Sequence, residues 1–186
     1  MTELALILPL LVVLVFGVIE FATAINETMV LTAAAREGAR VAGALANGGG
    51  ALGCGAGQSP NAADVDPAII AAVERVLTAS GTQIALADVN EIRIYKATAT
   101  GGETWNAVNR WTYSQDGGPL VGSERLDFAE QSNAWAVCLR NNVSPADSVG
   151  ITVRYSYRAH TPLRHFMPFE TINLGETTVM ALNATR

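Results

Sequence analysis

The chain has 186 residues, of which 49% are hydrophobic and only 16% are charged, and its mean hydropathy is +0.25. This balance excludes an intrinsically disordered chain, and the positive hydropathy indicates a strongly apolar segment. The formal net charge of −5 argues against nucleic-acid binding, because neutralising phosphate groups requires a basic face.

The N-terminus carries that apolar segment. The uncharged stretch from Leu4 to Ile19 lies between Glu3 and Glu20. At ~1.5 Å per residue it covers about 24 Å, slightly less than the ~30 Å core of a bilayer. Extending it through Ile25 makes it long enough at the cost of including Glu20, so we expect a membrane-spanning helix. A cleaved secretory signal is disfavoured, because Met1-Thr2-Glu3 is acidic where a signal peptide is basic.

Helical sequence continues beyond the apolar run to Ala46, which predicts a single helix over residues 1–46. Pro9 lacks an N–H group and should kink the helix or loosen a turn, and Gly17 is a second weak point. Small residues recur every four positions in the second half. They form two parallel rows: Ala34, Gly38, Ala42 and Ala46, and Ala35, Ala39 and Gly43. Such rows allow close helix packing, either on the chain's own head or against neighbouring subunits.

Two carboxylates in this helix need an explanation. Glu3 lies near the positive end of the helix dipole, which alone accounts for an acid at a membrane interface. If helices instead pack side by side without lipid, a buried carboxylate needs a partner, and the α-amine of an adjacent chain is the obvious one. Glu20 raises the same question in mid-helix, with Arg36 or Arg40 of a staggered neighbour as candidate partners.

Residues 47–186 have the pattern of a small α+β head that follows a glycine-rich neck, residues 47–61. Asp66 and Pro67 predict an N-cap and first position of a helix that ends at Gly81. Asp64 and Asp66 could suggest a metal pair, but no third ligand accompanies them. Alternating polar and apolar residues predict antiparallel strands. These lie at residues 91–95 and 151–157 and, more weakly, at 105–113 and 177–184, with a turn at 116–119.

Three motifs in the N-terminal helix suggest a known family: an acid followed by an apolar run ending in proline (Glu3 to Pro9), then Ile19-Glu20-Phe21, then AAREGAR (Ala34 to Arg40). With Ile151–Leu163 and the closing VMALNATR, they resemble TadE-like proteins, the pilin-related subunits of tight-adherence (Flp-type) systems. The resemblance implies a type IV pilin-like architecture. A prepilin peptidase removes a leader, an acid near the new N-terminus assists assembly, and the apolar helices leave the membrane to form a filament core.

One spacing departs from the pilin pattern. The assembly acid of type IV pilins is the fifth mature residue, whereas Glu3 is the third residue here. Processing that makes Met1 the mature N-terminus is therefore a hypothesis. Export would place Cys54 and Cys138, the two cysteines, in an oxidising compartment, where an even count favours a disulfide over two buried thiols.

The sequence contains no recognisable catalytic motif. His160 and His165, the two histidines, lack the HExxH spacing of a zinc site, and there is no GxSxG elbow. A modest basic patch remains: Arg158, His160, Arg164 and His165. It is either a solvated loop, a subunit contact or a site for an anionic ligand. We therefore expect neither enzymatic activity nor a cofactor or metal.

These observations predict an α+β protein with a long N-terminal helix (residues 1–46) and a globular head (residues 47–186). Our leading hypothesis is a homo-oligomeric pilus subunit, held in the inner membrane before assembly and exposed at the cell surface afterwards. Its partners would be the pilus assembly machinery and a prepilin peptidase. One alternative is a minor or priming subunit that uses the same contacts. Another is a periplasmic binding module for which the helix is only a membrane tether.

Overall fold

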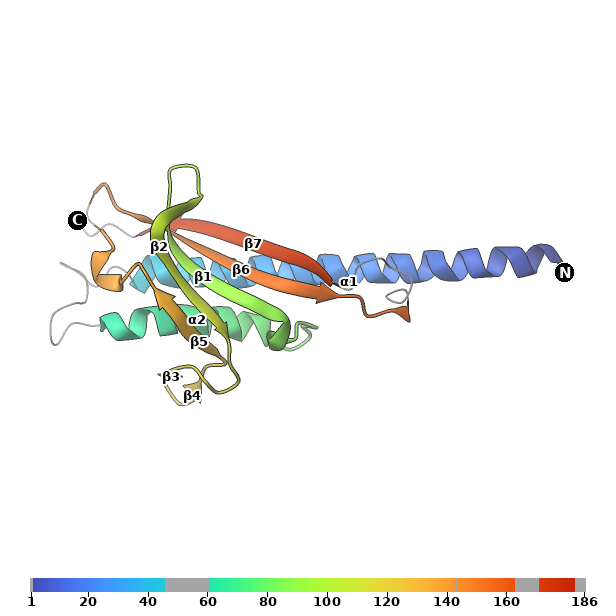
Figure 1. Ribbon diagram of the computed structural model, residues 1–186, viewed down its shortest axis with the longest axis horizontal. Helices are drawn as coiled ribbons and strands as arrows, with labels where there is room; N and C mark the ends of the chain where they lie inside the picture. Colours follow the sequence, from blue (N-terminus) through green and yellow to red (C-terminus); the bar gives the residue numbers. More distant parts are fainter. Residues whose placement is uncertain (1, 46–60, 143, 163–170, 183–186) are drawn as a thin grey trace.

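A computed structural model of the protein describes residues 2–45, 61–142, 144–162 and 171–182, with side chains from residue 7 onward (Figure 1). Helix α1 (Thr2–Leu45) is uninterrupted and passes through both Pro9 and Gly17. It confirms the predicted long helix, although Met1 and Ala46 lie outside the described residues. The N-terminal part of α1 projects far beyond the rest of the molecule (Figure 1).

Helix α2 (Ala62–Leu77) begins earlier than predicted. Its N-cap is Asn61, whose side chain accepts a 3.1 Å hydrogen bond from the backbone N–H of Ala63. The prediction of Asp66 as the N-cap is therefore wrong, and Pro67 lies inside the helix. Asn61 is as good a cap as Asp66, and an internal proline this close to the start removes only one backbone hydrogen bond. The helix also ends before Gly81, the predicted end, with Thr78 as its C-cap.

Five antiparallel strands form the main sheet, in the order β5-β2-β1-β6-β7. They are β1 (Val89–Ala97), β2 (Glu103–Tyr113), β5 (Phe128–Asn133), β6 (Ser148–Arg158) and β7 (Thr171–Ala181). The four predicted strands correspond to β1, β2, β6 and β7, and β7 begins six residues earlier than expected, at Thr171 rather than Thr177. Strand β5 and the small ribbon of β3 (Leu120–Val121) and β4 (Glu124–Arg125) were not predicted. The α+β fold class is confirmed.

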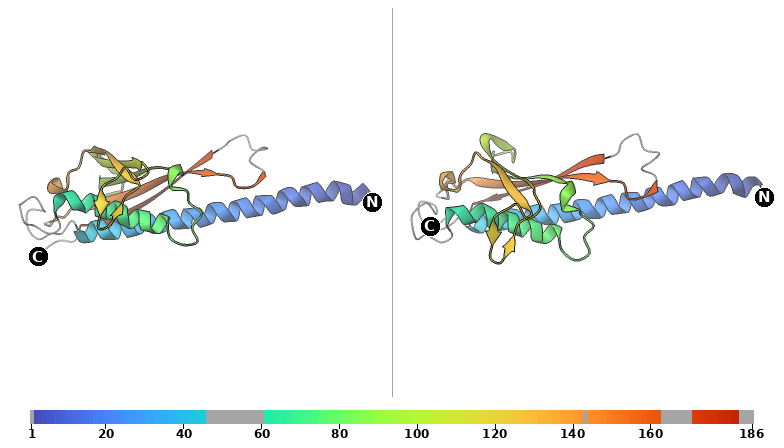
Figure 2. Two further views of the ribbon diagram at one scale, coloured as in Figure 1. Left: turned by 90° about the horizontal axis from the view of Figure 1, so that it is seen from below. Right: turned by 60° about the horizontal axis from the view of Figure 1, so that its bottom comes forward.

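The two helices cover one face of the sheet, as Figure 2 shows from two further directions. Helix α1 packs against α2, β6 and β7. Alternate residues of the central strands point towards the helices, and Ile92, Ile94, Ile151 and Val153 are fully buried there. No described helix covers the opposite face, and most side chains that β1 and β6 place there are polar. Arg93 on that face pairs with Glu91 at 2.6 Å and with Glu103 at 3.0 Å.

The rows of small residues lie on the face of α1 that touches the chain's own head. Ala34, Ala35, Ala39 and Ala42 are at most 1% exposed. A Cβ atom on Gly38 would come within 2.6 Å of Val73 Cγ2. The head therefore occupies the described part of both rows. The sequence predicted that these rows pack either on the chain's own head or against neighbouring subunits. In this structure they pack on the head.

Candidate functional site

The N-terminal part of α1 is free of the head. From Ile7 to Ile19 its large aliphatic side chains are 44–69% exposed, and they point in all directions around the helix. A helix that is apolar all round belongs in a membrane or among other apolar helices rather than in water. This helix is also long and apolar enough to cross a bilayer. We call residues 2–19 the apolar stalk.

Four residues that we singled out for assembly belong to this end of the chain. Pro9 and Gly17 lie within the stalk, and a Cβ atom on Gly17 would meet nothing within 4 Å. Glu3 lies in the first turn of α1, but its side chain is outside the described residues, as is Met1. A pairing between Glu3 and the N-terminus of a neighbour stays a prediction.

The stalk ends at Glu20, which the head binds directly. Glu20 is only 6% exposed. Its Oε1 accepts hydrogen bonds from the Tyr157 hydroxyl and from the backbone N–H of His160 (2.9 Å), and its Oε2 accepts one from the backbone N–H of Thr161 (3.0 Å). The pairing of Glu20 with Arg36 or Arg40 of a neighbour stays a prediction, and within this chain Glu20 does not depend on it. Its carboxylate is already satisfied within the chain, and Arg40 pairs with Glu37 at 2.6 Å.

A second buried acid lies two helical turns further along α1. Glu27 is 1% exposed, and its Oε1 lies 3.2 Å from His160 Nε2. Burial and the adjacent Glu27 carboxylate raise the pKa of Tyr155, and burial with the Glu20 hydrogen bond raises the pKa of Tyr157 to about 12. The Tyr157 hydroxyl thus stays protonated at physiological pH and remains a donor to Glu20. We call Glu20, Glu27, Tyr157, His160 and Thr161 the stalk–head junction.

Two of the four residues in the predicted basic patch, Arg158 and His160, already pair with carboxylates of the same chain. His160 contacts Glu27, and Arg158 Nε lies 3.0 Å from Asp88 Oδ1. Both basic groups therefore already have a carboxylate of the same chain beside them. Arg164 and His165 lie outside the described residues. The described part of the patch consequently offers no unpaired cation to an anionic ligand.

A buried polar cluster that the sequence did not reveal joins α2 to β2 and to the short helix η2 (Val137–Leu139). Asp66, 4% exposed, lies 2.7 Å from Arg140 Nη2 and accepts a 2.8 Å hydrogen bond from Asn109 Nδ2. Arg140 also stacks over the ring of Trp135, 4.8 Å from its centroid. The cluster explains why Asp66 lies inside the helix. Among the described residues, no group of three His, Cys, Asp or Glu side chains could hold a metal.

The predicted Cys54–Cys138 disulfide would join this region to the neck. Cys138 lies in η2, directly before Leu139 and Arg140. Cys54 and most of the neck (residues 46–60) lie outside the described residues. The Cys54–Cys138 bond therefore stays a prediction.

Comparison with known proteins gives a family match for the part of the chain that contains the stalk and the two junction acids, Glu20 and Glu27. Residues 1–40 match the family model of the TadE-like proteins. The match confirms the TadE-like resemblance at Glu3 to Pro9, at Ile19 to Phe21 and at Ala34 to Arg40. No curated protein and no solved structure matches the chain.

The TadE-like segment thus contains the apolar stalk, Glu20, Glu27 and the first small residues that pack on the head. The weaker likeness that we noted at Ile151–Leu163 lies outside the matched range. Together, the TadE-like match and the exposed apolar helix indicate a Tad pilus-associated protein with a membrane-anchoring N-terminal helix.

Proposed function

We propose that this protein is a structural, non-enzymatic pilin subunit that polymerises through its apolar stalk into a Tad-type filament at the cell surface and supports attachment there. The observation that carries the proposal is the contrast along α1: from Ile7 to Ile19 the aliphatic side chains are exposed on all sides, whereas beyond Glu20 the head covers one face of the helix. The stalk and the exposed side chains of Phe21, Ile25 and Met29 that follow it are left to contact lipid before assembly and neighbouring subunits afterwards.

The length of the stalk suits both a lipid bilayer and the core of a filament. Its 18 residues, from 2 to 19, cover about 27 Å at ~1.5 Å per residue, close to the thickness of a bilayer core. In the inner membrane, lipid chains would cover its leucine, isoleucine and valine side chains. In a filament, the stalks of neighbouring subunits would cover the same side chains, and the heads would lie outside this apolar core.

Glu3 and Glu20 would have different roles in this mechanism. Glu3 would set the axial register by pairing with the N-terminus of a neighbouring chain, because a carboxylate in an apolar core needs a charged partner. Glu20 would fix the height of the head above the stalk through its hydrogen bonds to Tyr157, His160 and Thr161. Register set at Glu3 would thereby determine where each head sits on the filament. A prepilin peptidase and the pilus assembly machinery would process and extract the subunit.

An exchange of the stalk tests the proposal. Residues 2–19 are replaced by an unrelated transmembrane helix of equal length, and residues 20–45 are kept because this part of α1 packs on the head. Filaments sheared from cells are then examined by electron microscopy, and their main component is identified by mass spectrometry. We expect membrane insertion without filaments. Normal filaments from the exchanged protein would overturn the proposal and favour the alternative in which the helix is a tether for a periplasmic binding module.

Substitution of Glu3 gives a finer test. Glu3→Ala should stay in the membrane and assemble poorly, and a filament yield equal to that of the unmodified protein would contradict the register role.

The second candidate function is that of a minor or priming subunit, which would use the same contacts. The TadE-like match supports it equally well, and the abundance of the protein in sheared filaments separates it from the main subunit.

A further inference from the structure

The start of β2 carries an irregularity that exposes a tryptophan. Tyr95 of β1 pairs with Val108 and Ala97 pairs with Glu103, so Lys96 alone lies opposite the four residues Thr104 to Ala107. Asn106 inside this bulge has a φ of +56°, a conformation that non-glycine residues rarely adopt. Bulges redirect side chains, and strained residues are frequent at binding sites. Here the redirected side chain is Trp105, which is 88% exposed.

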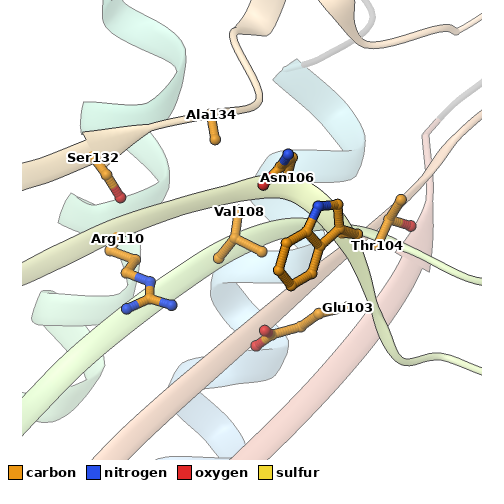
Figure 3. A pocket seen from close by; sticks show the side chains of 8 residues that line it. Glu103, Thr104, Asn106, Val108, Arg110, Ser132 and Ala134 are labelled. Carbon is orange, nitrogen blue, oxygen red and sulfur yellow. The ribbon is translucent and has the colours of Figure 1, made fainter.

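Beside the bulge, the outer edge of β2 has no strand partner. Strand β5 pairs with β2 only from Asn109 to Tyr113. In the part of the chain that the structure describes, no strand continues this pairing towards Glu103. A hollow of about 470 Å³ lies there, within the range of small-molecule sites. Trp105 lines this hollow, and Figure 3 shows Glu103, Asn106 and Arg110 of β2 and Ser132 of β5 around it.

The groups around Trp105 are polar and have hydrogen-bonding capacity to spare. Within the described residues, the side chains of Asn106, Arg110 and Ser132 form no hydrogen bond or ion pair with the rest of the chain. Glu103 is held by Arg93 at 3.0 Å and has further acceptor sites. The hollow therefore combines one flat aromatic face with an amide, a guanidinium, a hydroxyl and a carboxylate.

We propose that this hollow, the Trp105 site, binds carbohydrate. One face of a sugar ring presents C–H groups of slight positive charge, which pack favourably on the electron-rich face of an aromatic ring. The hydroxyl groups at the rim of the sugar both donate and accept hydrogen bonds, and Asn106, Arg110, Ser132 and Glu103 provide the complementary groups.

Other classes of ligand fit the Trp105 site less well. Glutamate is depleted at the centre of protein–protein interfaces, whereas the Glu103 carboxylate borders this tryptophan. Glu103 and the net charge of −5 disfavour a nucleic acid, although bases also stack on aromatic rings. The inference goes beyond the proposed assembly role, because the site lies on the head, away from the stalk.

The chain contains a built-in probe for this site. Of its three tryptophans, Trp111 and Trp135 are 2% and 3% exposed, so a soluble quencher such as acrylamide reports mainly on Trp105. We suggest titrating the full-length protein, in lipid nanodiscs free of glycolipid, with cellobiose, lactose and N,N′-diacetylchitobiose. Sugar-based detergents must be avoided. We expect at least one disaccharide to halve the quenching constant and to show saturation transfer from the protein to its ring protons.

Variants identify the residue responsible. Trp105→Ala should weaken binding at least about tenfold, or about 1.4 kcal/mol, in the saturation-transfer measurement. Trp105→Phe should retain part of the affinity because the aromatic face remains. Leu120→Ala is the matched control, since Leu120 is 61% exposed on β3 and does not line the hollow.

Three outcomes would overturn the proposal. The first is that no disaccharide of the set changes the quenching of Trp105. The second is sugar binding that survives in Trp105→Ala, because the sugar would then bind elsewhere. The third is protection of Trp105 that depends on protein concentration instead of sugar, which would identify a contact between subunits. None of these outcomes bears on filament assembly, so the Trp105 site and the proposed function can fail separately.

Discussion

The backbone N–H of His160 donates a 2.9 Å hydrogen bond to the carboxylate of Glu20, a residue 140 positions earlier in the chain. The segment that follows β6 is thereby attached to α1 at the point where the helix enters the head. The aliphatic side chains from Ile7 to Ile19 are exposed, whereas Ala34, Ala35, Ala39 and Ala42 are buried. This contact therefore marks the point beyond which the head covers one face of the helix, while Phe21, Ile25 and Met29 stay exposed on the uncovered side.

Removal of the Glu20 carboxylate should loosen the junction. In Glu20→Ala, the N–H groups of His160 and Thr161 lose their acceptor, and the Tyr157 hydroxyl keeps only longer contacts, such as that to the Glu20 carbonyl oxygen at 3.3 Å. Buried donors without a good partner are costly. We expect the free energy of unfolding to fall by about 3 kcal/mol, measured by chemical denaturation of the protein in nanodiscs.

Glu37→Gln is the matched control on the same helix. Glu37 forms only the exposed pair with Arg40, so the change should be within about 0.5 kcal/mol. Equal losses for Glu20→Ala and Glu37→Gln would contradict a structural role of the junction.

A pair of glycine substitutions distinguishes the covered part of α1 from the stalk. Gly38→Ala places a methyl group 2.6 Å from Val73 Cγ2, so helix and head must move apart, at a cost of about 1–3 kcal/mol. Gly17→Ala meets nothing within 4 Å and should stabilise the isolated helix by roughly 0.5–1 kcal/mol. Thermal unfolding compares the two variants, and a harmless Gly38→Ala would show that the helix does not pack on the head as described.

The buried Asp66–Arg140 pair should matter more than the cap of α2. Arg140→Ala leaves Asp66 charged and buried, with Asn109 as its remaining hydrogen-bond donor, and should lower the free energy of unfolding by about 3–5 kcal/mol. Asn61→Ala removes one capping hydrogen bond and should cost about 1 kcal/mol. Urea denaturation measures the loss of unfolding free energy in both variants. A larger loss for Asn61→Ala than for Arg140→Ala would contradict this ranking.

The stability of the head should depend on pH through Glu74. Burial raises the pKa of this carboxyl above its ordinary 4.5, and the nearby Asp127 and Glu124 raise it further, despite a hydrogen bond from the Asp127 N–H. Because the folded state holds the proton more tightly, the free energy of unfolding should fall as the pH rises from 4.5 through the raised pKa. Above that pKa, this contribution should be constant.

Glu74→Gln isolates the effect, because glutamine carries no charge in this range. The difference in unfolding free energy between Glu74→Gln and the unmodified protein should therefore increase with pH and then level off. Glu130→Gln, which changes an exposed carboxylate on β5, serves as the control. A difference for Glu74→Gln that does not change with pH would exclude the assigned shift.

Local patterns predicted much of this fold, and contacts between distant segments account for the rest. The apolar run, the small-residue rows and the alternation at Ile92 and Ile94 are encoded within a few positions, so the helix and central strands could be read from the sequence. Strand β5 could not, because it lies at the sheet edge and four of its residues are exposed, which removes the alternation. The start of α2 was misplaced because Asn61 and Asp66 are equivalent caps and only the distant Arg140 distinguishes them.

The candidate sites, too, could be predicted only where their residues are close together in the sequence. The TadE-like motifs indicated the stalk, since they are contiguous in sequence. The partners of Glu20 lie in β6 and the segment after it, and no spacing rule connects residues so far apart. The sequence places Trp105 only in a weakly predicted strand, because the bulge that exposes its side chain depends on pairing with β1.

The length over which α1 lies along the head has a mechanical consequence. In a filament of the proposed kind, tension would pull each subunit along the axis of this helix. Because α1 runs beside α2, β6 and β7, such a pull would load their shared surface in shear, with many side chains resisting at once. A subunit joined to its stalk only by a flexible tip would instead separate one contact at a time. The overlap from Glu20 to Leu45 thus suits the protein to carry force as well as to hold its shape.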